Sequence, residues 1–139
     1  MPLPINQFKF MKSKNFDLVL AIIAAVIMLQ TLFYKFSGSA ESIYIFSTLG
    51  IEPWGRIGAG VSELIAGILL IINRTRVLGA LMGIGIMLGA IAAHVLVLGI
   101  VVQADGGKLF MLALITFLAC LILIARNRHQ VLQILKFKF

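Results

Sequence analysis

Four apolar stretches, each about as long as the hydrocarbon layer of a membrane is thick, limit the fold of this chain most. They cover residues 17–36, 54–72, 77–101 and 108–125. A membrane-spanning helix needs about 20 mostly apolar residues, and each stretch is close to that length. We therefore expect an all-α transmembrane four-helix bundle that forms a single domain over residues 1–139.

The composition supports this expectation. Of 139 residues, 61% are hydrophobic and 12% are charged, whereas a soluble domain is about half apolar and a quarter charged. A chain of this length has too little interior to bury so much apolar surface in water. Cys120 is the only cysteine, which excludes an intramolecular disulfide, a CxxC motif and a cysteine-rich metal site.

The basic residues predict the orientation. Nine lie on one side of the predicted spans, in the tails 1–16 and 126–139 and in the turn 73–76. Three lie on the other side, namely Lys35, Arg56 and Lys108. By the positive-inside rule we expect a multi-pass protein of the cell inner (cytoplasmic) membrane with both termini in the cytoplasm. We expect the basic tails to lie along the anionic inner leaflet, and we expect no nucleic-acid partner, because these charges flank apolar runs.

One polar residue in each span falls in the outer half of the membrane. At about 1.5 Å of rise per residue, Glu63 and Thr116 lie roughly 12–13 Å below the outer ends of their spans, and His94 and Gln30 roughly 9–10 Å. Titratable groups inside a membrane are costly and normally face the bundle interior. We predict that Glu63 meets His94 there and that the two are the candidate catalytic, proton-carrying groups.

Two interpretations of this polar layer stay open. In the first, it is a ligand pocket lined by Gln30, Tyr34, Lys35, Glu63, His94 and Thr116. In the second, Glu63 and His94 only satisfy each other as a buried pair that fixes helix register. One histidine and one glutamate are too few for a typical catalytic zinc site, so we expect no metal.

The longest outer connection, residues 37–53, predicts a short interfacial helix. Apolar residues recur in it at helical spacing. Ser39 suits its N-cap, Glu41 its first turn and Gly50 its end.

The third span is rich in small residues. Gly79 and Gly83 form one small-xxx-small register, and Gly85, Gly89 and Ala93 form another. Such spacing lets helices approach closely in lipid. Packing within the bundle and homo-oligomerisation through this span both fit the pattern.

The chain resembles the DoxX-like family of small four-helix membrane proteins over roughly residues 18–125. The resemblance is carried by residues 60–99, which read GVSELIAGILLIINRTRVLGALMGIGIMLGAIAAHVLVLG. Two further segments match, FYKFSG at the end of the first span and IFSTLGI in the connection after it.

The resemblance implies a role beside quinone-linked redox chemistry, with a quinone as the possible cofactor and a redox protein as the possible partner. Related four-helix folds include sterol isomerases and vitamin K reductases, and the single Cys120 departs from the cysteine pairs of the latter. We therefore expect a protein that binds a quinone or another small apolar ligand and is accessory to membrane redox chemistry. The alternatives are a non-catalytic subunit or scaffold that packs through the third span, and a small proton-linked transporter. Whether the chain is an enzyme is left open.

Overall fold

The computed structural model describes the backbone of residues 5–137 and the side chains of residues 14–136. This part of the chain is helical and contains no strand. Its α-helices are α1 (Ile5–Gln30), α2 (Leu32–Ser37), α3 (Ala40–Thr48), α4 (Trp54–Ile71), α5 (Arg76–Ala93), α6 (Lys108–Arg126) and α7 (Arg128–Phe137). A 3₁₀ turn, η1 (Asn73–Thr75), precedes α5, and a π-helical turn, η2 (His94–Leu98), follows it.

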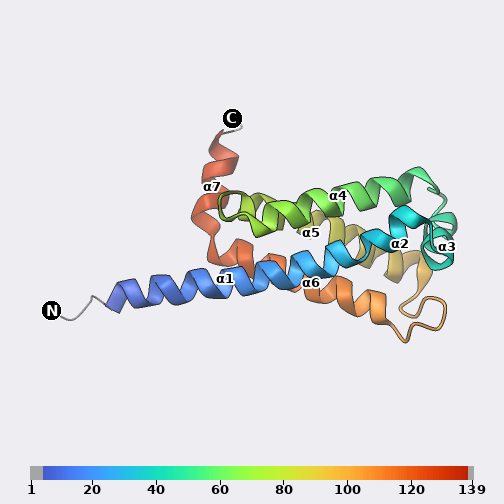
Figure 1. Cartoon of the computed structure of the whole chain (residues 1–139), viewed down its shortest axis with the longest axis horizontal. Coiled ribbons are helices and arrows are strands. Elements are labelled where there is room, and N and C mark those ends of the chain that lie inside the picture. The colour runs from blue at the N-terminus through green and yellow to red at the C-terminus, as the bar shows by residue number, and fades with distance from the viewer. Residues whose placement is uncertain (1–4, 138–139) are drawn as a thin grey trace.

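Four helical segments of the described chain are long and apolar enough to cross a membrane, namely Lys14–Ser37, Trp54–Ile71, Asn73–Leu98 and Lys108–Arg126. They form an up-and-down bundle in which α1 and α5 each pack against both α4 and α6 (Figure 1). The predicted all-α four-helix membrane bundle is confirmed. The third segment ends earlier than predicted, because Gly99 follows it with φ of +81°, a conformation that glycine adopts readily.

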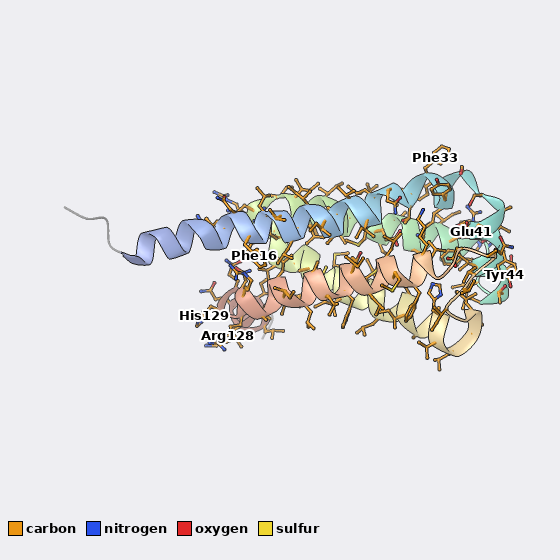
Figure 2. All side chains as sticks on the ribbon, turned by 90° about the horizontal axis from the view of Figure 1, so that it is seen from below. Phe16, Phe33, Glu41, Tyr44, Arg128 and His129 are labelled. Carbon is orange, nitrogen blue, oxygen red and sulfur yellow. The ribbon has the colours of Figure 1, made fainter. Side chains whose placement is uncertain are left out.

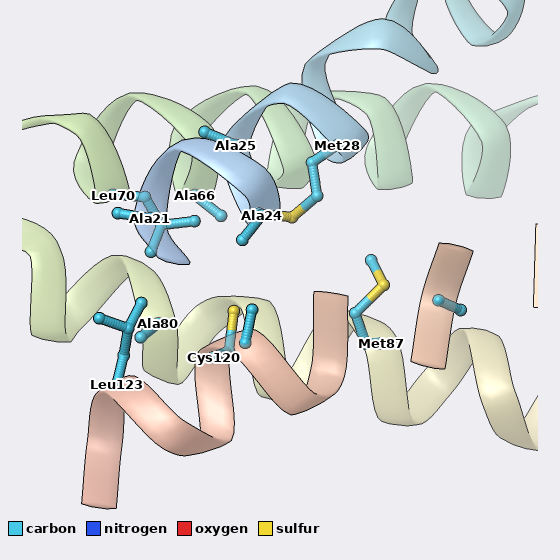
Figure 3. Packing of buried hydrophobic residues seen from close by; sticks show 12 residues of the cluster. Ala21, Ala24, Ala25, Met28, Ala66, Leu70, Ala80, Met87, Cys120 and Leu123 are labelled. Carbon is cyan, nitrogen blue, oxygen red and sulfur yellow. The ribbon is translucent and has the colours of Figure 1, made fainter. Parts of the chain in front are cut away.

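The core of the bundle is made largely of small side chains. Alanines from all four spans are buried there, among them Ala24, Ala66, Ala80 and Ala119, and Met28 and Leu70 fill the space between them (Figure 3). Many leucines, isoleucines and valines of the same helices are instead exposed. Small residues inside and large apolar residues outside are typical of helices that pack against one another in lipid, so a lipid bilayer is the surrounding of this bundle.

The two glycine registers of α5 have different surroundings. A Cβ atom added at Gly79 would lie 2.6 Å from the backbone nitrogen of Leu70, and one added at Gly83 would lie 2.7 Å from the Cys120 sulfur. At Gly85 and Gly89 an added Cβ would meet nothing within 4 Å, and both are exposed. Gly79 and Gly83 therefore serve packing within the bundle, whereas assembly through the other register, which ends at the half-buried Ala93, stays a prediction.

One end of the bundle carries α3, and we call it the α3 end. The predicted short helix is confirmed there: the Ser39 hydroxyl accepts a hydrogen bond from the Ser42 backbone N–H at 3.2 Å. After the helix, Gly50 has φ of +76°, and the Ile51 N–H donates to the Phe46 carbonyl at 3.0 Å. This arrangement is a Schellman motif, which satisfies carbonyls that the end of the helix leaves free.

The opposite end holds the start of α1, the turn between α4 and α5, and α7; we call it the basic end (Figure 1). Arg76 is buried in this turn, and its guanidinium donates to the carbonyls of Leu70 and Ile71 at 2.9 and 3.3 Å. These bonds cap α4. Within the predicted basic tails, residues 1–4 and 138–139 lie outside the described range, residues 5–16 belong to α1 and residues 128–137 form α7.

Candidate functional site

A break in the first span positions the candidate site. The helix ends at Gln30 and starts again at Leu32, so that Thr31 lies between α1 and α2. The Thr31 hydroxyl approaches the Met28 carbonyl at 2.8 Å, and the Thr31 backbone N–H donates to the same oxygen at 3.3 Å. A threonine hydroxyl that bonds back onto its own helix bends that helix. The bend brings one polar stripe, Thr31 and Lys35, against α4.

Glu63 of α4 meets this stripe. The Lys35 ammonium lies 2.9 Å from Glu63 Oε2 and 3.2 Å from Oε1, and it donates to the Thr31 hydroxyl at 3.0 Å. The Thr31 hydroxyl also lies 2.9 Å from Glu63 Oε2. The side chains of Lys35 and Glu63 are only 15% and 7% exposed. Three polar groups from two spans are therefore joined in one buried cluster, which we call the Lys35–Glu63 cluster.

The sequence around Glu63 explains its burial. Gly60 and Gly67 lie on the same face of α4, about one turn on either side of the acid. A Cβ at Gly60 would lie 2.8 Å from the Phe36 ring, and one at Gly67 would lie 2.8 Å from the Leu29 side chain. The glycines thus let Phe36 and Leu29 lie against α4 above and below Glu63, which shields the acid from lipid.

Arg56 supports the cluster from the α3 end. Its guanidinium is held by Glu52 at 2.8 Å and donates to the backbone carbonyl of Lys35. The carbonyls at the end of a short helix need such partners. Arg56 therefore fixes the backbone of Lys35 and leaves the Lys35 ammonium to Glu63.

The predicted meeting of Glu63 with His94 is wrong. Glu63 bonds to Thr31 and Lys35, whereas His94 Nδ1 lies 2.9 Å from the Gly99 carbonyl. The His94 ring also packs edge-on against Phe110, with the ring centroids 5.6 Å apart. The π-helical turn that starts at His94 directs its ring toward the connection that follows it.

Other residues of the predicted layer do not join this cluster. Gln30 is exposed, and Tyr34 is 55% exposed. Thr116 is fully buried, and its hydroxyl donates to the Leu112 carbonyl of its own helix at 2.9 Å. Of the predicted residues the structure therefore brings together Lys35 and Glu63. Thr31 was missed, although its spacing of four residues before Lys35 places both on one helix face.

The connection after His94 is organised by Asp105. Its carboxylate accepts hydrogen bonds from the backbone N–H groups of Val102, Gly107 and Leu109 at 2.8–3.2 Å. Partial burial acts to raise the pKa of Asp105, but these bonds and the nearby His94 outweigh it, so the pKa lies below its ordinary value. Asp105 thus acts as a cap for α6.

A third ion pair lies at the basic end and was not predicted. Arg126 Nε lies 2.6 Å from Asp17 Oδ1, and the Asn127 side-chain amide donates to Asp17 Oδ2 at 3.2 Å. The Arg126 guanidinium also lies 4.7 Å from the centre of the Phe16 ring. The pair joins the start of the first span to the end of the fourth. The sequence feature that could have indicated this pair is Asp17, an acid among residues that are otherwise basic at that end of the predicted spans.

Comparison with known proteins identifies one family. The DoxX family model matches residues 16–97, which is more than half of the chain. The matched range contains Asp17, the Lys35–Glu63 cluster and His94. No curated protein and no solved structure matches the chain.

Proposed function

The chain belongs to the DoxX family, and on that premise we propose that its Lys35–Glu63 cluster binds the polar head of a quinone or another small apolar ligand. The protein would then be accessory to membrane redox chemistry. We further propose that the basic end faces the cytoplasm in the cell inner membrane, because eight of the twelve basic residues lie in the described part of that end.

The observation that carries this proposal is the burial of an ion pair between two spans. Buried ion pairs contribute little net stability, since the loss of hydration offsets the attraction. Ionisable side chains within a membrane are therefore a functional hypothesis by default. A purely structural tie between α2 and α4 would be made as well by apolar side chains of similar volume.

The side chains around the cluster fit such a ligand. Lys35 supplies an ammonium and Thr31 a hydroxyl, which suit a carbonyl oxygen of the ligand. Gln30 and Tyr34, which directly precede Thr31 and Lys35 in the sequence, are exposed. A ligand that arrives from the lipid would therefore contact them first. Phe33 is exposed on the same segment (Figure 2) and offers an apolar surface for a ring or tail.

The chemistry of the cluster is proton handling. Reduction of a quinone to a quinol takes up two electrons and two protons, and a redox partner protein would supply the electrons. The Lys35 ammonium, held by Glu63, would give one of these protons to the ligand head, and water at the α3 end would supply the second proton and reprotonate Lys35. Thr31 holds both groups in place.

A second candidate function is a scaffold that assembles through α5. Gly85 and Gly89 are exposed, and they leave open space where another helix can approach. In that case the Lys35–Glu63 cluster fixes helix register, and its removal changes stability alone.

Mass spectrometry of the small molecules that co-purify with the protein separates these candidates. The variant Lys35→Met/Glu63→Leu removes both charges and keeps the volume, so the bundle should remain folded. We expect a quinone or lipid that is enriched in the native protein to be lost from this variant. Asp17→Asn, which changes the Asp17–Arg126 ion pair, should retain the co-purified quinone or lipid. Equal retention by all three folded proteins would refute the ligand site and favour the scaffold.

A further inference from the structure

A groove at the basic end lies apart from the Lys35–Glu63 cluster. It has a volume of about 450 Å³ and is formed where α7 lies beside the start of α5. Its lining residues are Arg74, Val77, Gln130, Gln133 and Ile134. The volume falls within the roughly 300–1,000 Å³ typical of sites for small molecules.

The polar groups of this groove have no partner within the described chain. No described residue bonds to the guanidinium of Arg74 or to the side-chain amides of Gln130 and Gln133. Arg76, two residues further along, shows the contrast, because three acceptors of the preceding turn hold its guanidinium. Arg74 therefore offers a free fork of N–H donors, which matches the oxygens of a phosphate.

The charge around the groove favours an anion. Eight basic residues lie in the described part of the basic end, where Asp17 is the only acid among the described residues, and Arg126 and Asn127 already hold that carboxylate. Arg128 and Lys136 lie on the same helix as the two glutamines. This excess of positive charge attracts anionic lipid head groups within about 10 Å of the surface.

The groove also lies at the depth of a head group. Arg74 and Val77 are on the first turns of the third apolar segment, which begins at Asn73. The helix α7 runs crosswise to the spans (Figure 1), and its Leu132 and Leu135 are exposed. A basic helix with apolar side chains in this orientation lies in the membrane interface. The groove thus combines the exposed polar side chains of Arg74, Gln130 and Gln133 with the buried Val77 and the half-buried Ile134 at the boundary of the hydrocarbon.

We propose that this groove binds the head group of an anionic phospholipid, with the lipid phosphate against the Arg74 guanidinium. Gln130 and Gln133 donate to the remaining phosphate or glycerol oxygens. The apolar side chains of Val77 and Ile134 contact the start of the acyl chains. The lipid joins α7 to the turn between α4 and α5.

Native mass spectrometry of the delipidated protein tests this proposal. The protein is titrated with phosphatidylglycerol, with phosphatidylcholine and with inorganic phosphate. We expect one phosphatidylglycerol to bind at least about fivefold more tightly than phosphatidylcholine, which is the effect of one basic residue near an anionic surface. Arg74→Gln should lose that preference, and Arg74→Lys, which keeps the charge but not the fork of donors, should keep only part of it. Inorganic phosphate should not displace the lipid.

Lys108→Gln is the matched control, because it removes one charge at the α3 end, and it should bind phosphatidylglycerol as the native protein does. Circular dichroism verifies that each variant keeps its helix content. An Arg74→Gln variant that retains the native preference would overturn the proposal. Displacement by phosphate alone would show a free-anion site and would also overturn it.

Discussion

The α3 end and the basic end of the bundle differ in the ratio of basic to acidic residues and in how many of these residues are paired. At the α3 end, three basic residues accompany four acids. Lys35 pairs with Glu63 and Arg56 with Glu52, and Asp105 accepts hydrogen bonds from backbone N–H groups. At the basic end, eight described basic residues accompany a single described acid, Asp17. Figure 2 labels Glu41 and Tyr44 at the α3 end and Arg128 and His129 at the basic end.

Two of the three described ion pairs, Lys35–Glu63 and Asp17–Arg126, show the same contrast between the two ends. The Lys35–Glu63 pair lies within a span, and both side chains are at most 15% exposed. The Asp17–Arg126 pair lies where the spans end, and the arginine side chain is 32% exposed. Water can solvate the second pair but not the first, so each pair should respond differently when one partner is removed. On this comparison the Lys35–Glu63 pair is the functional candidate, and the Asp17–Arg126 pair joins two helices where the spans end.

The largest effect is expected at the Lys35–Glu63 cluster. Glu63→Leu leaves the Lys35 ammonium buried without a counter-ion, and the free energy of unfolding should fall by about 3–5 kcal/mol. In Lys35→Met/Glu63→Leu most of that loss should be recovered. Thermal unfolding in detergent, followed by circular dichroism, measures both. A double variant as unstable as the single one would mean that the ion pair itself stabilises the bundle.

A smaller effect is expected at the basic end. Asp17→Asn leaves Arg126 near water and against the Phe16 ring, so the free energy of unfolding should fall by about 1 kcal/mol or less. The same detergent unfolding assay measures it. A loss as large as that of Glu63→Leu would remove the distinction between the two ends.

The smallest effect is expected from pH at the connection before α6. The pKa of Asp105 is lowered in the folded protein, so its contribution is complete above the ordinary value of 3.8 and is lost as pH falls through the lowered pKa. The amide proton signals of Val102 and Gly107, followed by NMR, should shift below pH 3.8. In Asp105→Asn the shift should be absent; a midpoint above 3.8 would contradict the assigned hydrogen bonds.

The fold could be predicted further than the site. Span length and apolar composition defined the bundle, and Ser39 and Gly50 defined α3 through local capping that needs no distant partner. Depth along each span was the basis for predicting that Glu63 and His94 meet, but depth says nothing about direction around the helix axis. The π-helical turn at His94 and the break at Thr31 change that direction, and neither has a strong sequence pattern.

Ion pairs between residues far apart in the chain also could not be predicted from the sequence. Asp17 and Arg126 are separated by 109 positions, and each alone is an ordinary residue at the end of a span. The cluster partner Lys35 was named because it lies one turn above the acid. The sequence could not decide whether its ammonium turns toward Glu63 or toward the end of the bundle, since the length of the side chain permits both directions.

The alanine-lined core of this bundle has a consequence for which substitutions it tolerates. In a soluble protein the surface accepts most exchanges and the large core residues accept few. Here Ala24, Ala66 and Ala80 are completely or almost completely enclosed, so one added methylene has no room. The exposed leucines, isoleucines and valines face acyl chains that adapt to any apolar shape. A saturation library should therefore tolerate change on the bulky outer positions and reject it at the smallest side chains of the chain.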